Sequence, residues 1–368
     1  MVARRWLIIV ATLGVLLASC NAFECKKDGA SQDTCPSEPP AAGIEIKFAD
    51  AITKKYGARR MLEEGIPLRD GSLIDIVDEA TVKNSNATFV RKILLQGKEM
   101  SRMKLKVPKE FDQSEIDSSK WMPDTGSLDH ALPQTIVIED MFTSDAMEIS
   151  RDTAARIVII GLAAGYMNSY LHQAYPKMNI TVVEEDAKMV EVATKWFNLT
   201  LDDRHSVDVI DGVEFVERAV KEGRNYDAIL IEASVKNTGD DSEVKSPTKK
   251  LYSKATVEKM AKLLKPKGVL VIHVRSTGGA RSTAVKEMQS SFKKSFRKCA
   301  LKEIPVEKAS LVLTCSNHVS TKPYNGLRAR YVLFAKYPDT DEQVRSIKEI
   351  LNTKIPAKPL NTCSRSRK

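Results

Sequence analysis

Short apolar runs alternate with amphipathic segments through the middle of the chain. The runs lie at 157–160, 180–183, 207–210, 228–231 and 269–274. Between the second and third runs, apolar residues recur at helical spacing: Met189, Val192, Ala193, Trp196 and Phe197. Strands that alternate with helices at this spacing predict an α/β fold with a parallel, doubly wound sheet.

The pattern differs on both sides of this region. Apolar residues alternate or bunch like short strands at 73–78, 87–95 and 103–107, an amphipathic segment near 141–149 predicts a helix, and 327–335 predicts a further strand. We therefore divide the chain into a signal peptide (1–22), a flexible tether (23–69), a small amino-terminal β region (70–140), a Rossmann-like domain (141–337) and a basic tail (338–368).

The first 22 residues have the layout of a targeting segment. Arg4 and Arg5 precede an apolar run at 6–17, and small residues follow. A cleaved signal peptide is our first prediction, an uncleaved signal anchor is the second, and the segment 17–20 would be a lipid-attachment box in a bacterial chain. Three glycosylation sequons, at Asn86, Asn179 and Asn198, favour the eukaryotic secretory route. We predict a secreted glycoprotein or one of the endoplasmic reticulum lumen.

Charge indicates no particular macromolecular partner. The net charge of +9 is moderate, and basic residues are scattered except in the tail, so no specific nucleic acid binding is expected. No zinc-ligand spacing and no phosphate-binding loop motif is present, and we predict no metal site.

A small-residue turn follows the first apolar run. Gly161, Ala163 and Gly165 occupy the positions of a glycine-rich turn, and Glu184 follows the second run. Such a turn lets the backbone approach a ligand closely, and an acid some twenty residues on suits a ribose diol. The turn alone is weak evidence, since any tight strand-to-helix connection favours glycine.

Two further acids follow the third and fourth apolar runs. Asp211 precedes Gly212, and Glu232 precedes Ala233 and Ser234. The carboxyl ends of parallel strands meet at one edge of a sheet, so these acids and Glu184 point at one crevice. The competing interpretation is that such an acid only ends a strand and has no chemical role. For Glu232 the two interpretations are about equally well supported.

The order of these motifs resembles the class I S-adenosylmethionine-dependent methyltransferases and the spermidine synthases. Segments 191–197, 203–204 and 211–212 resemble the carboxy-terminal domain of the methyltransferase-like proteins that modify elongation factor 1-alpha, and the similarity covers about 128–317. The resemblance implies a seven-stranded doubly wound Rossmann-like methyltransferase sheet behind a small β region that helps cover the crevice. It also implies S-adenosylmethionine, or a decarboxylated analogue, as the small-molecule cofactor, and it leaves a homodimer open.

The resemblance assigns roles to the candidate residues. Glu184 would bind the ribose hydroxyls, Asp211 the adenine amino group with Gly212 leaving space, and Gly161, Ala163 and Gly165 the methionine part. Glu232 stands where the family has an aspartate, which acts as a base in the spermidine synthases. The extra methylene of Glu232 displaces the carboxylate by about 1 Å, a change that can cost roughly a hundredfold in rate.

Six cysteines leave the pairing open. Cys20 lies in the targeting segment, Cys25 and Cys35 are near neighbours in the tether, and Cys363 lies in the tail. Cys299 and Cys315 fall on the expected sixth and seventh strands, which the resemblance pairs antiparallel; a disulfide and two buried thiols are equally good interpretations.

Three functions follow. The first is a methyltransferase with an unknown acceptor, and the second is an aminopropyl transferase like the spermidine synthases. The third is a non-catalytic secreted module that keeps the fold, favoured by Ala163, by Glu232 and by a secretory address. The polar loop at 236–250 is either a lid over the acceptor site or a mobile connection.

Overall fold

A computed structural model describes residues 59–83, 86–108, 117–128, 132–234, 242–304 and 307–336, together with Lys54 and Gly57. Within these residues the larger sheet has the strand order β11-β12-β10-β8-β5-β6-β7, with β9 paired to β10 beside this path. Its strands are β5 (Arg156–Ile160), β6 (Asn179–Glu184), β7 (His205–Val209), β8 (Tyr226–Ile231), β9 (Val244–Ser246), β10 (Leu264–Ser276), β11 (Lys298–Glu303) and β12 (Ser310–Ser316). The neighbours from β7 to β10 are parallel, and β12 is antiparallel to both β10 and β11. The predicted seven-stranded doubly wound sheet is confirmed.

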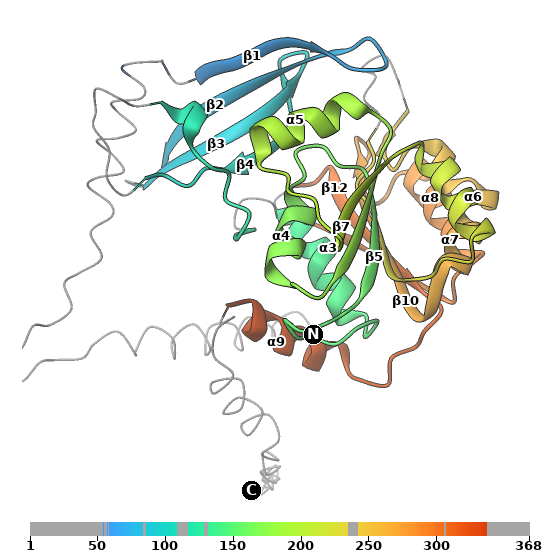
Figure 1. Cartoon of the computed structure of the whole chain (residues 1–368). Helices are drawn as coiled ribbons and strands as arrows, with labels where there is room; N and C mark the ends of the chain where they lie inside the picture. Colours follow the sequence, from blue (N-terminus) through green and yellow to red (C-terminus); the bar gives the residue numbers. More distant parts are fainter. Residues whose placement is uncertain are drawn as a thin grey trace, which may run out of the picture. The chain divides into compact units, whose positions relative to one another are not determined.

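Helices cover both faces of this sheet (Figure 1). Helices α6 (Gly212–Lys221), α7 (Lys254–Leu263) and α8 (Thr283–Lys293) pack on one face. Helices α3 (Leu132–Thr143), α4 (Tyr166–Ala174) and α9 (Tyr324–Lys336) pack on the other, joined by part of α5 (Ala187–Phe197). Two short 3-10 helices, η2 (Ser118–Lys120) and η3 (Lys249–Tyr252), complete the described elements.

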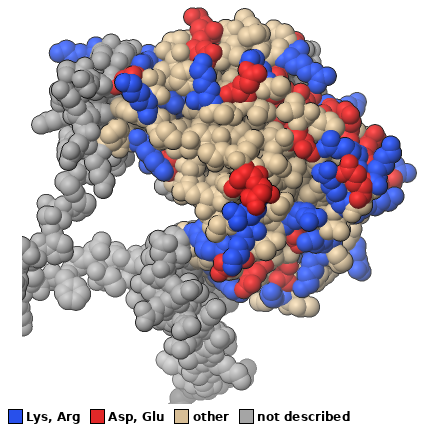
Figure 2. All heavy atoms as spheres, in the orientation of Figure 1, with Lys and Arg blue, Asp and Glu red and all other residues tan. Residues whose placement is uncertain are grey.

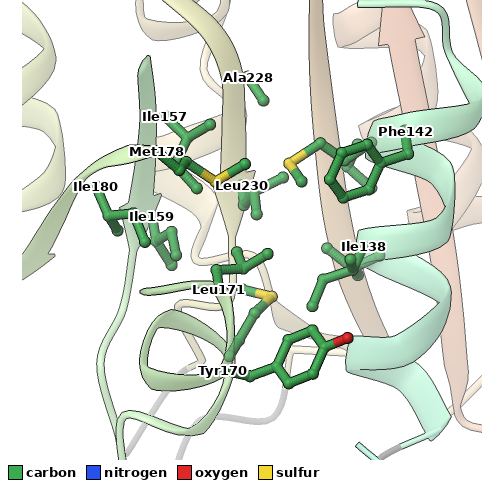
Figure 3. Close-up of a cluster of buried hydrophobic side chains, with 14 of the residues drawn as sticks. Ile138, Phe142, Ile157, Ile159, Tyr170, Leu171, Met178, Ile180, Ala228 and Leu230 are labelled. Carbon is green, nitrogen blue, oxygen red and sulfur yellow. The ribbon is translucent and has the colours of Figure 1, made fainter. Parts of the chain in front are cut away.

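The apolar runs contribute side chains to the cores on both faces of the sheet, because successive side chains along a strand point to opposite faces. Ile157 and Ile159 belong to the core beneath α3 and α4, whereas Val158 and Ile160 belong to the core beneath α6 to α8. Figure 3 shows residues of α3 and α4 directed toward β5 and β8 in the first of these cores. A strand buried on both faces must be continuously apolar, which explains the runs in the sequence.

A separate four-stranded antiparallel sheet precedes the larger one. Its strands are β1 (Arg59–Pro67), β2 (Leu73–Lys83), β3 (Asn86–Leu95) and β4 (Lys98–Lys104), in sequence order. Its inner face shares a hydrophobic cluster with Met189, Val192 and Phe197 of α5. Buried Arg91 ties the same surfaces together, because it pairs with Asp78 at 2.8 Å and donates to the carbonyl of Trp196.

The structure corrects two domain boundaries and one element type. Strand β1 starts at Arg59, so the tether does not extend to residue 69; the strand buries only Ile66, and its exposed charges give it the composition of a linker. Helix α3 starts at Leu132, so the Rossmann-like domain begins before residue 141. The strand expected at 327–335 is helix α9, since Leu327 and Tyr331, one helical turn apart, both face the core.

A disulfide joins Cys299 and Cys315, which lie directly opposite each other on β11 and β12. Cys20, Cys25, Cys35 and Cys363 lie outside the described residues, as do the predicted signal peptide, most of the predicted tether and the predicted tail. Within the described ranges, no helix has both the length and the apolar character needed to cross a bilayer. The predicted localisation therefore stays a prediction.

Candidate functional site

A cavity of about 550 Å³ opens at the carboxyl ends of β5, β6 and β8. Its volume falls in the range of ordinary small-ligand sites. The lining comes from the turn after β5, the ends of β6 and β8, β10, the start of α3, the segment 307–310 and Glu99 to Arg102 of β4. Because β4 supplies one wall, the small sheet helps cover the cavity, as the resemblance implies.

The small-residue turn forms one side of the cavity. Gly161 has φ of +105°, and a Cβ there would lie 3.0 Å from the backbone carbon and oxygen of Glu232, so only glycine fits. Ala163 has φ of +49°, a left-handed conformation that alanine rarely adopts, and Gly165 has φ of +72° at the N-cap of α4. Gly161 and Ala163 line the cavity, and Gly165 does not.

Glu184 ends β6 and is only 6% exposed. Its two carboxylate oxygens accept from different backbone amides at 3.1 Å, one from Leu162 and the other from Asp186. A carboxylate oxygen has room for more than one donor, so a pair of hydroxyls in the cavity can be accepted without breaking these bonds. The residues present therefore fit the ribose diol of S-adenosylmethionine.

Asp211 caps helix α6 and does not line the cavity. One of its oxygens accepts from the amides of Val213 and Glu214, and the other pairs with Lys250. Burial alone would raise the pKa of Asp211, but the bonds from Lys250 and the two amides outweigh it and lower the pKa. A contact between Asp211 and an adenine would therefore compete with Lys250.

Gly212 and Lys250 do line the cavity beside Asp211. A Cβ at Gly212 would lie 2.9 Å from a methyl group of Ile160, so the glycine is required by close packing of α6 against β5. Lys250 also reaches Glu185 at 3.5 Å. Burial would lower the pKa of Lys250, but Asp211 and Glu185 raise it.

Glu232 follows β8 and lies beside His273 of β10 and Gln134 of α3. The Nδ1 atom of His273 lies 3.2 Å from each carboxylate oxygen of Glu232, and all three residues line the cavity. The carboxylate is 20% exposed and the imidazole 7% exposed. A carboxylate held in this way can take a proton from a bound acceptor.

Some residues of the cavity were not predicted from the sequence, because they belong neither to the glycine turn nor to the strand-end acids. Gln134, Lys250, His273 and the β4 wall all reach the cavity. His273 had a usable signal, since it is the one polar residue in the apolar run 269–274. His130, a lone histidine shortly before α3, lies outside the described residues.

Charges of both signs surround the cavity. Its lining includes the cations Arg102, Lys250, Arg275 and Lys308 and the anions Glu99, Glu184, Glu185, Glu232 and Glu307. The face shown in Figure 2 likewise mixes acidic and basic side chains around uncharged surface. Among the described residues, no group of three or more His, Cys, Asp or Glu side chains is arranged to hold a metal ion.

Residues 145–325 match the spermine/spermidine synthase domain family. The eEF1A lysine and N-terminal methyltransferase homolog of Drosophila melanogaster is 32% identical over 124 residues, 34% of this chain and 18% of that protein. The eEF1A lysine and N-terminal methyltransferase of Bos taurus is 30% identical over 129 residues, with the same coverage of 34% and 18%. The polyamine aminopropyltransferase of Vibrio vulnificus is 33% identical over 78 residues, 21% of this chain and 26% of that protein. The chain thus spans under a fifth of the length of the two eEF1A methyltransferases.

Two solved structures share the fold. Human methyltransferase-like protein 13 in complex with SAH has a TM-score of 0.51 and 20% identity, covering 59% of this chain and 98% of that one. A "probable spermidine synthase" from Corynebacterium glutamicum has a TM-score of 0.51 and 17% identity, covering 83% and 98%. The resemblance to the methyltransferase and spermidine synthase superfamily is confirmed.

Proposed function

We propose that this chain, whose residues 145–325 match the spermine/spermidine synthase domain family, is an S-adenosylmethionine-dependent methyltransferase. The observation that carries the proposal is the setting of Glu184. Its carboxylate is fixed by the amides of Leu162 and Asp186 at the edge of a cavity of nucleoside size. Bidentate acceptance of a ribose diol is what such a carboxylate does well.

The sequence relatives support methyl transfer. Seven relatives named for methylation of eEF1A are 25–32% identical to segments of this chain. Because the chain matches only part of those proteins, their acceptor does not carry over. We leave the acceptor unassigned.

Aminopropyl transfer is the second candidate, supported by the family match and by the relative from Vibrio vulnificus. Its cofactor, decarboxylated S-adenosylmethionine, lacks the carboxylate of the methionine part. Arg102 already pairs with Glu99 at 3.2 Å, but the cavity lining also includes Arg275 and Lys308 as cations for such a carboxylate, so we rank the methyl donor ahead of its decarboxylated analogue.

Calorimetric titration of the purified chain tests the proposal. S-adenosylmethionine and S-adenosylhomocysteine should bind with micromolar affinity, and decarboxylated S-adenosylmethionine should bind more weakly. Absence of heat with all three ligands at millimolar concentration would support the non-catalytic module. Tighter binding of the decarboxylated compound would support aminopropyl transfer.

We also propose that the chain enters the secretory pathway and carries glycans. Asn179 is exposed at the amino end of β6, away from the cavity at the carboxyl end, so a glycan there leaves the site open. Expression in a mammalian cell line should give a product that glycosidase treatment shifts to lower mass. An unshifted product retained in the cytosol would contradict both statements.

A further inference from the structure

Three polar side chains converge on one face of the larger sheet near its carboxyl edge. Ile272 of β10 pairs with Ile231 of β8, so the next residues, His273 and Glu232, stand side by side. Both Ile272 and Ile231 face α6 to α8, and alternation along the strands turns His273 and Glu232 toward α3. Gln134 lies in the first turn of α3. The convergence thus follows from strand register as well as from side-chain positions.

The contacts among them centre on the Glu232 carboxylate. His273 Nδ1 lies 3.2 Å from both oxygens, a hydrogen-bond distance, whereas Gln134 Nε2 lies at 3.4 Å and 3.5 Å, which is long for one. The backbone amide of Glu232 donates to Ile160 at 2.9 Å, so the main chain at this position is held as well. His273 is therefore the stronger contact of the carboxylate.

The environment of His273 indicates its tautomer. Its Nε2 atom is buried and has no hydrogen-bond partner among the described residues. The Nε2–H tautomer and the imidazolium both carry a proton on Nε2. In either form this buried N–H would lack an acceptor. The neutral Nδ1–H form instead places its only N–H on the carboxylate.

We propose that His273 is a positioning residue that, as a neutral Nδ1–H donor, holds the Glu232 carboxylate in the wall of the cavity. Glu232 has one methylene more than the aspartate that the resembled family has at this position. The contact with His273 fixes where this longer side chain places its carboxylate. This role rests on the proposed function.

The chemistry that Glu232 would perform is a proton transfer. A proton leaves the acceptor atom for a Glu232 oxygen, and its bonding electrons stay on the acceptor. That electron pair forms the bond to the methyl carbon, while the electrons of the carbon–sulfur bond remain on sulfur. Nδ1 of His273 already carries a proton, and its Nε2 is buried without a partner among the described residues, so the proton stays on Glu232 until it returns to solvent.

Nitrogen NMR of the full chain labelled with ¹⁵N-histidine tests the inference. The His273 resonances, assigned by their loss in His273→Asn, should show a protonated Nδ1 and an unprotonated Nε2, with about tenfold preference over the reverse tautomer. Free histidine favours the Nε2–H form, so an unconstrained ring would give the opposite pattern. A predominant Nε2–H form or an imidazolium at pH 7.5 would overturn the inference.

Two variants test the link to the carboxylate. Glu232→Ala should abolish the Nδ1–H preference, and Glu232→Asp should weaken it severalfold, because the shorter side chain draws the oxygens back. Glu191→Gln, on the exposed surface of α5, should leave it unchanged. An unaltered tautomer in Glu232→Ala would show that another group sets it and would overturn the proposal.

Calorimetry on the same samples separates this inference from the proposed function. The wild-type chain and the Glu191→Gln control should bind S-adenosylmethionine with the same affinity, within twofold, because Glu191 lies on the exposed surface of α5. Binding with the wrong tautomer would refute only the positioning role. The Nδ1–H tautomer in a chain that does not bind the cofactor would confirm the contact but refute its catalytic purpose.

Discussion

Replacement of Glu184 by glutamine changes one carboxylate oxygen to an amide group and leaves the size of the side chain almost unchanged. In the wild-type chain each oxygen accepts one backbone amide at 3.1 Å, from Leu162 or Asp186. The glutamine NH₂ must face one of these donors or the cavity. In either orientation the side chain accepts from one ligand hydroxyl at most, and it loses its charge.

The expected loss can be worked out from these contacts. One charge-assisted hydrogen bond contributes about 1.5–3 kcal/mol, and the remaining bond becomes a neutral one. A total loss of about 3 kcal/mol corresponds to a decrease in affinity of roughly a hundredfold. One buried backbone amide also loses its acceptor, so the free energy of unfolding should fall by about 1–3 kcal/mol.

Two measurements keep these effects apart. Calorimetry with S-adenosylhomocysteine measures affinity, and urea unfolding without ligand measures stability. Glu191→Gln is the matched control, because it makes the same chemical change on an exposed part of α5. If folded Glu184→Gln binds within twofold of wild type, Glu184 does not bind the ribose and our account of the site is wrong.

Three further predictions concern stability, measured by urea unfolding. Gly161→Ala places a Cβ 3.0 Å from backbone atoms and should lower the free energy of unfolding by about 2–4 kcal/mol. The control Gly223→Ala, with φ of +64° and no atom within 4 Å, should lower it by about 1 kcal/mol. Equal losses would contradict the close approach at Gly161. Burial, with the charge of a neighbouring histidine, lowers the pKa of His205 from 6.5 to about 4, so its stabilisation is complete above pH 6.5 and is lost as pH falls toward 4. Between pH 7.5 and 5.5 His205 should account for about 1.4 kcal/mol of lost stability that His205→Gln does not show; equal slopes for the two chains would refute this. Lys302→Met should lower the free energy of unfolding by roughly 2 kcal/mol, because it removes the cation paired with Asp140, a carboxylate only 2% exposed. Adding Asp140→Asn should recover part of that loss. If nothing is recovered, lost packing causes the effect.

The larger sheet could be predicted from the sequence because its strands are buried on both faces. That requirement leaves apolar runs such as 157–160 and 228–231, which are hard to mistake. Strand β1 gave no such signal, since it is held at the edge of the small sheet by backbone pairing with β2 and buries only Ile66. Local composition cannot distinguish such an edge strand from a linker.

Helix α9 shows the opposite ambiguity. Leu327, Ala329 and Tyr331 alternate with arginines and so have the period of a strand. Tyr331 stacks on Phe142 of α3 with ring centroids 5.5 Å apart, and Leu327, one turn earlier, enters the same core. Only tertiary packing decides between the two periods here.

Part of the candidate site could likewise be predicted from the sequence, and part could not. The turn residues and strand-end acids have fixed places in a doubly wound sheet, so Gly161, Glu184 and Glu232 could be placed at its carboxyl edge in advance. The bond between Asp211 and Lys250 could not, because it depends on how the segment after β9 folds back. His273 reaches Glu232 only through the register of β8 and β10, which sequence does not specify.

A crystal structure of the chain grown with S-adenosylhomocysteine tests the central claim most directly. We predict that the nucleoside occupies the cavity, with the two ribose hydroxyls each within hydrogen-bond distance of a different Glu184 oxygen. A ligand bound elsewhere, or seated in the cavity with its ribose turned away from Glu184, would contradict the account.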